Sequence, residues 1–558
     1  MNKILSTIIG FIFFGSIASA QLTEFSQGDI LSAGAMNQNF KYLEDRFGGL
    51  NEKTIECGNE GSGINQAIKE GYNSLIISGT CKENIKLDHS TGFPNILRLK
   101  GKNNDPSLDK IIDNSSNSLR LISLEYTNMI LRIDNLTVSG GLRGINSWGQ
   151  NTVWLENVVV NNHVGRGVHL WGKGFLNAYS TTVDGGQNSS GSNEIGFSVT
   201  GGSYAYLENV TSKNNSRAGI RVSAKSYVEF QSGDITGNLK GVEAYNDGKF
   251  HKINWNNGTL NLQNNTSYGI HCYQAEVELD SLTNILNFSG SNDAFHLSKC
   301  DGRIKNSVIS GGNGTNPLLG IYASRLILDN VTIKNHQGNL LNVDRSNLQF
   351  RNSNLITNES SSSKCLVYMS DTDFQFDAGT TINGANNTDC SGMGLYRSRG
   401  EIEDINVASA KDAVYAVSSD VRIKGGTFSS SGDAGITIRE GSRFRIESGS
   451  SNLSITTSAS GEAALEVRSN SYVKLDKESN SFSIDATGST NDSDIMIRGN
   501  SSIDFNNHTH SNVAVISASF ATIDDTVTIS KLICSSNAVI DKDSSATITD
   551  TSGCSQAQ

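Results

Sequence analysis

Four ionisable side chains occupy one position of a phrase that recurs along the chain: a glycine, an apolar residue, a variable residue and a second apolar residue. At the variable position stand Arg221, Glu243, His271 and His296. If successive phrases lie on neighbouring strands about 4.8 Å apart, these four side chains span about 15 Å. Such a row can supply a proton donor, a proton acceptor and a clamp for an anion, so these residues form the predicted catalytic site.

The same position carries polar or aromatic residues in other copies of the phrase. In chain order they are Asn146, His169, Ser198, Tyr322, Asn342, Tyr396, Tyr415 and Thr437. Because alternate side chains of a strand point to opposite sides, we expect the two apolar residues of each phrase to point inward. The variable residue is then expected to face solvent, with three of the nine histidines of the chain in a single row.

Aromatic and basic side chains flank this row, at the next outward position and just before the glycine. Exposed aromatic rings suit the apolar faces of sugars, and basic groups can meet the carboxylates or sulfates of an acidic polysaccharide. The implied partner is a polysaccharide or a cell-surface glycan. The predicted carbohydrate-binding residues are Arg143, Trp148, Arg166, His169, Trp171, Lys240, Tyr245, Tyr273 and Tyr322.

The same pattern also has a purely structural interpretation. Stacked rings and opposite charges stabilise a parallel ladder without any ligand. Arg221 beside Glu243 can be an ion pair between coils, worth less than about 1 kcal/mol when it is exposed. No metal or cofactor is predicted, because there is no CxxC motif or histidine-rich cluster and the outward positions offer a calcium ion only Glu243.

The spacing of the phrases predicts the element that positions these side chains. A second phrase, Leu-Glu-Asn-Val at 155–158 and 207–210, lies about ten residues before most of the glycines, and the unit repeats every 22 to 29 residues or so. A unit this short cannot bury its own apolar face and must stack on its neighbours, which is typical of a β-solenoid. The asparagines of the second phrase are expected to stack at a bend: Asn135, Asn157, Asn209, Asn306 and Asn330.

The first repeat has further features. Cys57 and Gly58 precede a short helix expected over 64–68, and a strand expected over 74–78 leads to a glycine, a threonine and Cys81. This arrangement resembles the N-terminal coil and cap of pectin-lyase-like right-handed parallel β-helix proteins, and the resemblance extends from about residue 54 to at least residue 440. It implies an all-β, right-handed parallel β-helix with a short N-terminal helical segment, in which a cap covers the strand edges of the first coil.

That resemblance implies little about activity. Polygalacturonase-like enzymes of this fold carry Asn-Thr-Asp, a paired aspartate, a histidine and Arg-Ile-Lys. Here Asn-Thr-Asp occurs at 387–389 and Arg-Ile-Lys at 422–424, but no histidine lies between them and the paired aspartate at 524–525 is in the wrong order. These tripeptides are therefore not predicted to form an active site.

The eight cysteines fall into four sequential pairs, each about one repeat apart. Residues one repeat apart lie in neighbouring coils, within reach of a disulfide, and an exported chain with such spacings is expected to be clipped by disulfides. The predicted pairs are Cys57 with Cys81, Cys272 with Cys300, Cys365 with Cys390, and Cys534 with Cys554.

The chain divides into four expected regions. Residues 1–20, with one lysine, an apolar run and small residues at 18–20, are a predicted signal peptide. Residues 21–50 place apolar residues at 36, 40, 43 and 47 on one helical face, which favours a cap over the first coil or, alternatively, an oligomerising stalk. Regular coils are expected over 54–440, with less regular coils and a closing unit over 441–558.

Export sets the expected location and partners. Residues 25–40 resemble a leader of exported bacterial and phage-fibre-like proteins, so the mature chain is expected in the periplasm, on the surface or outside a bacterium. The net charge of −11 gives no basic face for nucleic acid, and no later stretch is long and apolar enough to span a bilayer. A homo-oligomer through residues 21–50 is possible if that segment is a stalk.

These expectations favour a secreted protein that engages an extracellular glycan, and they leave two classes open. An enzyme, either a polysaccharide lyase or a glycoside hydrolase, is the first; a lyase would use His271 or His296 as the base at a sugar C5, with Arg221 neutralising the uronate. A non-catalytic surface adhesin, spike or matrix protein is the second, and it would need the aromatic residues but neither histidine.

Overall fold

A computed structural model describes most of the chain after residue 49. The described ranges are 50–58, 63–88, 95–125, 128–185, 194–252, 259–281, 285–288, 292–311, 316–356, 365–384, 391–448, 452–476, 482–487, 493–506, 509–524, 526–535 and 537–554. The signal peptide predicted over 1–20, nearly all of the segment 21–50 and the tripeptide at 387–389 lie outside these ranges.

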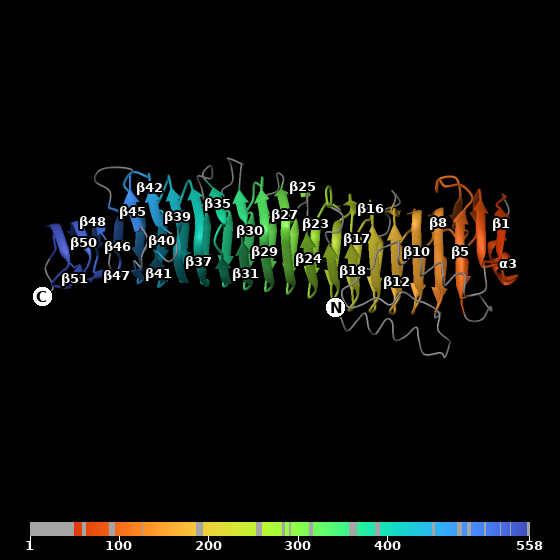
Figure 1. Ribbon diagram of the computed structural model, residues 1–558, viewed down its shortest axis with the longest axis horizontal. Coiled ribbons are helices and arrows are strands. Elements are labelled where there is room, and N and C mark those ends of the chain that lie inside the picture. The colour runs from red at the N-terminus through yellow and green to blue at the C-terminus, as the bar shows by residue number, and fades with distance from the viewer. Residues whose placement is uncertain are drawn as a thin grey trace, which may run out of the picture.

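The described chain is a long rod of strands stacked along one axis (Figure 1). Its strands form two long parallel sheets, here called sheet A and sheet B, of 32 and 20 strands. Within one coil the chain alternates between them: β9 (Arg143–Trp148) of sheet B is followed by β10 (Thr152–Asn161) of sheet A and β11 (Arg166–Trp171) of sheet B. β9 pairs with β11, and β10 pairs with β8 (Ile130–Ser139), always in parallel. The prediction of an all-β parallel β-helix is confirmed.

Asparagine bends the coils at a fixed point of sheet A. β10 pairs with β8 on both sides of Asn157, but Asn157 itself is skipped in the register and has a φ of 52°. Asparagine tolerates this left-handed conformation because its short side chain can hydrogen-bond locally. The side-chain amide of Asn157 donates to Oδ1 of Asn135 at 2.8 Å, and that of Asn330 donates to Oδ1 of Asn306 at 3.0 Å. The predicted stack of amides is therefore present in these two pairs, whereas the amide of Asn209 donates to Oγ of Ser180 at 3.1 Å.

The glycine of the recurring phrase permits close packing where the chain enters sheet B. A Cβ atom added to Gly167 would lie 2.3 Å from Cγ1 of Val183 and 2.9 Å from the carbonyl oxygen of Gly196 in the next coil. Carbon atoms in van der Waals contact lie about 3.5–4.0 Å apart, so no side chain fits at this position. The glycine fixes the start of each strand of sheet B and thereby the register of the residues that follow.

The interior of the rod is apolar along its length. Val168 and Leu170, the two apolar residues of one phrase, are both fully buried, as are Ile220 and Val222 two coils later. Burying each such side chain contributes roughly 1.5–3 kcal/mol before chain entropy is subtracted. Because the two inward residues alternate with outward ones, the apolar core also fixes which side chains of sheet B face outward.

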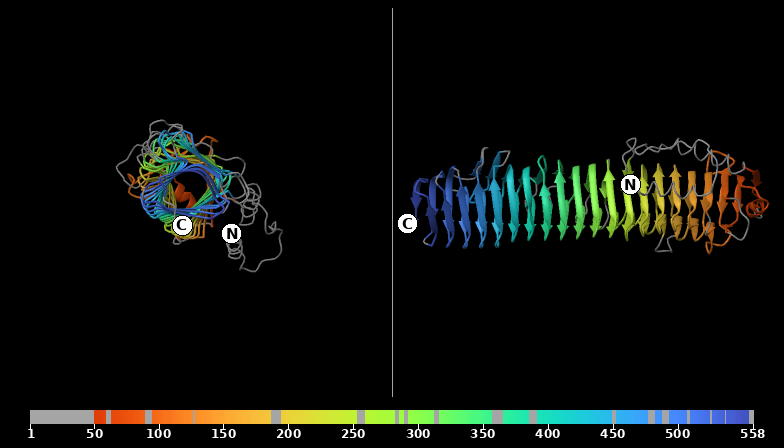
Figure 2. Two further views of the ribbon diagram at one scale, coloured as in Figure 1. Left: turned by 90° about the vertical axis from the view of Figure 1, so that its left-hand side faces the viewer. Right: turned by 60° about the horizontal axis from the view of Figure 1, so that its bottom comes forward.

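The N-terminal end of the rod is covered by α3 (Ile64–Lys69), which follows β1 (Glu52–Glu56). Seen along the axis, α3 lies inside the outline of the coils (Figure 2). Its residues Ile64, Ala67 and Ile68 are buried, so it shields the strand edges of the first coil from other chains. The predictions of this helix and of the strand β2 (Ser74–Ser78) are confirmed. No helix in the described ranges is long and apolar enough to cross a membrane.

Disulfides join neighbouring coils at both ends and in the middle of the rod. Three predicted pairs are confirmed: Cys57 with Cys81, Cys272 with Cys300, and Cys534 with Cys554. Cys365 is also disulfide-bonded, and its predicted partner Cys390 lies outside the described residues. Beyond residue 441 the parallel pairing continues to β52 (Thr547–Ser552), which lies against β50 (Thr528–Cys534).

Candidate functional site

The outward face of sheet B carries the predicted site. In order along the axis its strands are β7 (Arg120–Glu125), β9, β11, β14 (Ile195–Thr200), β17 (Ala218–Ser223), β20 (Lys240–Tyr245), β23 (Tyr268–Tyr273), β26 (Phe295–Ser298) and β28 (Leu319–Tyr322).

The outward side chains of these strands form three parallel rows. The basic row begins with Arg120, Arg143 and Arg166; the floor row runs Asn146, His169, Ser198, Arg221, Glu243, His271 and His296; the outer row runs Trp148, Trp171, Thr200, Ser223, Tyr245, Tyr273, Ser298 and Tyr322.

The four predicted catalytic residues are neighbours in the floor row. Arg221 is in register with Glu243, Glu243 with His271, and His271 with His296. The rings of His271 and His296 stack with centroids 5.4 Å apart. The structure thus brings these four residues together on one face.

The prediction that the floor row faces solvent is wrong for much of its length. Asn146 is only 1% exposed, His169 5% and Glu243 4%. The reason is that long side chains of the basic row lie across the floor: Nη1 of Arg143 is 2.6 Å from Oδ1 of Asn146 and 3.0 Å from Nδ1 of His169. A ligand would therefore touch the basic and outer rows before it reached the floor.

The register predicted for Tyr322 is also wrong. The structure pairs His296 with Gly320 and places Tyr322 beside Ser298 in the outer row. In this strand Leu319 is the first inward residue, so Gly320 stands at the variable position of the phrase. Gly320 leaves room for the ring of Tyr322, whose centroid lies 5.0 Å from that of His296. Tyr396 is shifted in the same way, beside Ser370.

Arg221 is held by neighbouring side chains. Its Nε lies 3.5 Å from Oε2 of Glu243, and its guanidinium lies 4.3 Å from the ring centroid of Tyr245. Glu243 also accepts from Lys240 at 2.7 Å and from Arg217 at 3.2 Å. Burial alone would raise the pKa of Glu243, but Lys240, Arg217 and Arg221 together hold it below its usual value. The ion pair of the structural interpretation is present, and it competes with any anion for Arg221.

The two predicted catalytic histidines have different surroundings. Burial, followed by the charge of Lys240, lowers the pKa of His271 to about 4, so this ring is neutral at pH 7. Its Nδ1 lies 3.4 Å from Nζ of Lys240, which can only donate. Nδ1 of His296 instead lies 2.9 Å from Oδ2 of Asp293, an arrangement that orients the ring. Asp293 was not among the predicted site residues.

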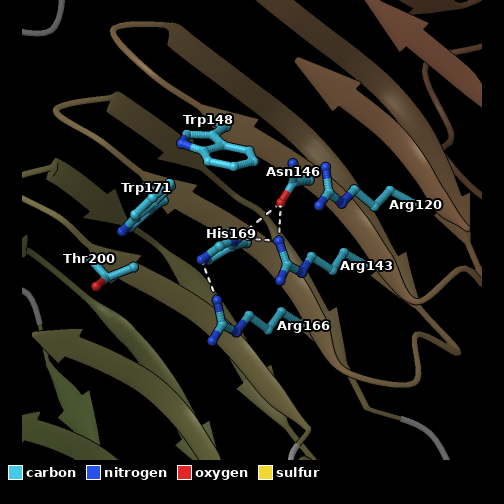
Figure 3. Close-up of a pocket in the computed structure, with 8 residues that line it drawn as sticks. All are labelled: Arg120, Arg143, Asn146, Trp148, Arg166, His169, Trp171 and Thr200. Atoms are coloured by element: carbon cyan, nitrogen blue, oxygen red, sulfur yellow. Dashed lines mark hydrogen bonds between the residues drawn. The ribbon is translucent and has the colours of Figure 1, made fainter. Parts of the chain in front are cut away.

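A pocket of about 350 Å³ opens at the N-terminal end of the three rows (Figure 3). The arginines form one side, the tryptophans the other, and Asn146 and His169 lie between them. Its volume falls within the range of about 300–1,000 Å³ that is usual for ligand sites. The lining residues are Arg120, Arg143, Asn146, Trp148, Arg166, His169, Trp171 and Thr200.

The basic side of the pocket carries positive charge that is only partly compensated. Arg120 forms an ion pair with Glu125. Arg143 and Arg166 have no carboxylate within 4.0 Å among the residues that the structure describes. Burial lowers the pKa of Arg166 to about 10, and the charges of Arg143, Arg221 and Arg217 act in the same direction. Burial, followed by the charge of Arg120, also lowers the pKa of Arg143. An anion in the pocket would relieve this repulsion.

His169 holds Arg166 in place as a neutral ring. Burial, followed by the charges of Arg166 and Arg143, lowers its pKa to about 2. In the tautomer where Nδ1–H donates to Oδ1 of Asn146 at 2.9 Å, Nε2 accepts from Nη1 of Arg166. Arg143 then donates to Asn146 and not to the ring, because Nδ1 of His169 is itself a donor. His169 therefore orients Arg166 without adding a charge to the pocket.

The aromatic side of the pocket is built by Trp148 and Trp171. Their ring centroids lie 4.7 Å apart, and Trp171 is 41% exposed. Gly201, with a φ of 72°, follows in the next coil, and a Cβ atom there would lie 2.7 Å from Cδ1 of Trp171. The glycine therefore lets the indole lie against the backbone of the neighbouring coil.

Sequence reasoning missed Arg120 and Thr200. Arg120 lies on β7, whose sequence RLISLE lacks the glycine of the phrase. Its spacing was the available signal, since 143 − 120 and 166 − 143 both equal 23 residues. Threonine is not a residue type that by itself indicates binding. The place of Thr200 in the pocket follows only from its register with Trp171.

Sheet A carries a second group of outward aromatic side chains that the sequence did not indicate. Tyr204 stacks with Tyr227 at a centroid distance of 5.5 Å, and the hydroxyl of Tyr204 donates to Oε2 of Glu229 at 2.7 Å. The hydroxyl of Tyr227 lies 3.2 Å from Nδ1 of His251. Because these polar groups bind one another, the structural interpretation is sufficient for this ladder.

Comparisons with known proteins add little to this geometry. No protein-family model matches the chain, and none of the curated proteins does. Among solved structures, tailspike protein 3 of bacteriophage CBA120 is similar, with 10% identity and a TM-score of 0.20; the match covers 100% of this chain and 70% of that one. That TM-score is too low for the two outward faces to be compared. Within the described ranges, no three His, Cys, Asp or Glu side chains are grouped so as to hold a metal ion.

Proposed function

We propose that this protein binds an acidic extracellular glycan through the pocket between Arg143, Arg166 and the two tryptophans. The observation that carries the proposal is a pair of adjacent, partly buried arginines without a carboxylate partner in the described chain. Holding two such charges together is unfavourable unless an anion neutralises them. Guanidinium groups one coil apart, about 4.8 Å, suit a carboxylate or sulfate between them.

The tryptophans favour a sugar over a simple anion. Trp148 and Trp171 lie across the pocket from the arginines (Figure 3), with Trp171 41% exposed. Indole rings bind apolar surface and tolerate a wet edge, which is the character of a sugar ring. A ligand that carries an acid group on a ring would meet both sides of the pocket at once. Sugars of acidic polysaccharides have this character.

The proposal predicts binding that depends on the acid groups of the polymer. We expect the purified mature chain to bind a carboxylated or sulfated polysaccharide at least tenfold more tightly than its carboxyl-reduced or desulfated form, a difference of about 1.4 kcal/mol. Affinity should fall as the Debye length shortens from about 10 Å at 0.1 M salt to about 3 Å at 1 M. A glycan array followed by calorimetry measures both effects. Equal binding of the charged and neutral polymers would contradict the proposal.

A polysaccharide lyase is the second candidate, and the contact between His296 and Asp293 favours it. A carboxylate on Nδ1 orients a histidine so that Nε2 can accept a proton, for example from C5 of a uronate. If the chain is a lyase, unsaturated products should absorb in the ultraviolet, and both His296→Ala and Asp293→Asn should reduce their formation about 100-fold or more. Absence of product on a broad panel of uronic-acid polymers would exclude this candidate and leave the binding proposal intact.

A further inference from the structure

The outer row contains a gap in its series of aromatic rings. Trp171 is in register with Thr200, the hydroxyl of Ser223 donates to Oγ1 of Thr200 at 3.2 Å, and Ser223 is in register with Tyr245. Two small side chains therefore separate the rings of Trp171 and Tyr245, which stand three coils, or about 14 Å, apart. By contrast, the rings of Trp148 and Trp171 in adjacent coils are in contact, with centroids 4.7 Å apart.

The gap leaves one face of Trp171 without an aromatic neighbour. Trp148 and Trp171 pack on one another with an interplanar angle of 54°, and Trp171 is the last ring of this pair. Trp148 packs against one side of Trp171, while the side toward β14 meets the small side chain of Thr200 and the backbone of Gly201, which lies against Cδ1 and Nε1 of the indole. Thr200 and Trp171 both line the pocket (Figure 3). At the far end of the gap stands Tyr245, with the guanidinium of Arg221 4.3 Å from its ring centroid.

Polar groups are placed on the other two sides of this gap. The hydroxyl of Thr200 lies within the gap. It accepts a hydrogen bond from Ser223 and keeps its own proton to donate. Arg166 stands across the pocket in the basic row, and its nearest hydrogen-bond partner is the neutral His169. The gap thus offers an apolar wall, a hydroxyl and a cation within one pocket.

We propose that a single ring of the acidic glycan occupies the gap between Trp171 and Tyr245, its apolar face on Trp171, a hydroxyl on Thr200 and its acid group toward Arg166. This inference rests on the proposed function and assigns the sugar unit, a six-membered ring with one carboxylate or sulfate, to a defined place. It makes Thr200 a residue that determines specificity, because only a small side chain at this position leaves the face of Trp171 open.

The test is to fill the gap without touching any charged residue. In Thr200→Trp the new indole can pack on Trp171 as Trp171 packs on Trp148, so the coil is expected to fold. We expect this variant, and likewise Thr200→Phe, to bind the acidic polysaccharide at least 30-fold more weakly than the wild-type chain. Thr200→Ala removes the hydroxyl but leaves the gap open, and it should weaken binding only about two- to tenfold.

Thr427→Trp is the matched control, since Thr427 is an exposed threonine of β39 (Asp420–Ser430) in sheet A, away from the face of sheet B that carries the site. Its affinity should equal that of the wild-type chain, and thermal unfolding checks that all variants are folded. If Thr200→Trp binds as tightly as Thr427→Trp while the charge dependence of binding holds, the ring position is wrong and the proposed function stands. If the wild-type chain binds no acidic polysaccharide, both proposals fall.

Discussion

Replacing Arg143 and Arg166 together by alanine is expected to abolish the binding of acidic glycan, and each single replacement should weaken it about 10- to 100-fold. A hydrogen bond to a charged group contributes roughly 1.5–3 kcal/mol, and about 1.4 kcal/mol corresponds to a factor of ten in affinity. Both guanidiniums are partly buried, so bulk salt screens them less than it screens surface charges. Calorimetric titration of the polysaccharide into each variant measures the effect.

Two controls separate loss of the site from loss of the fold. Arg399→Ala removes an arginine from sheet A whose side chain is 72% exposed and pairs with Asp373, and it should leave binding unchanged. Arg143→Lys and Arg166→Lys keep the charge but lose the planar fork, so their affinities should lie between those of wild type and the alanine variants. Because Arg143 and Arg166 repel each other, neither alanine variant should lower the unfolding temperature through lost ion pairs. Undiminished binding in the double variant would refute the assignment of the site.

Acidification from pH 7 to pH 4 is expected to destabilise the rod near β11 by up to about 3 kcal/mol through His163 alone. Burial lowers the pKa of His163 in the folded chain to about 4, whereas an unfolded chain has an ordinary histidine pKa of about 6.5. Between these values the unfolded chain binds a proton that the folded chain does not. The contribution is therefore fully present above about pH 6.5 and is lost progressively as the pH falls toward 4.

His163→Asn is the matched variant for this effect. His163 packs against Gly167 of the recurring phrase, with Cε1 3.1 Å from where a Cβ would lie, and in later coils the amides of Asn215 and Asn238 take similar places against Gly196 and Gly219. Asparagine does not titrate, so the difference in unfolding free energy between wild type and variant should depend on pH only below about 6.5. Hydrogen exchange of β11 across this pH range gives the measurement, since a stacked rod can open locally. A difference that is constant with pH would show that His163 does not titrate in this way.

The fold could be predicted because two residue types recur where the backbone of most coils needs them. The glycines at 144, 167 and 219 are needed for the approach of neighbouring coils, and asparagine takes the left-handed bend, so both recur at regular intervals. A second use of glycine explains why the register predicted for Tyr322 is wrong. The glycine of the phrase directly precedes the first inward residue, whereas Gly320 directly follows it, two positions later. Spacing alone does not distinguish the two uses of glycine.

The candidate site was predictable only as a set of rows. Alternation fixed that His169, Trp171 and Glu243 point away from the core. Which of them a ligand can reach depends on how the longer side chains lie. Arg143 covers Asn146 and reaches His169. The pattern of residue types in the sequence does not predict this contact. Likewise, pairing with Glu243 makes Arg221 less available to an anion than Arg143 and Arg166.

The pocket is assembled from rungs rather than from loops, and this affects how it can change over evolutionary time. Arg120, Arg143 and Arg166 are the same element of three successive coils, each 23 residues from the next. Duplication or loss of one complete 23-residue stretch would lengthen or shorten the binding groove by a single step of about 4.8 Å. The rest of the rod would keep its register. Such a protein can match the length of its ligand in whole-number increments, without redesigning any contact that it already has.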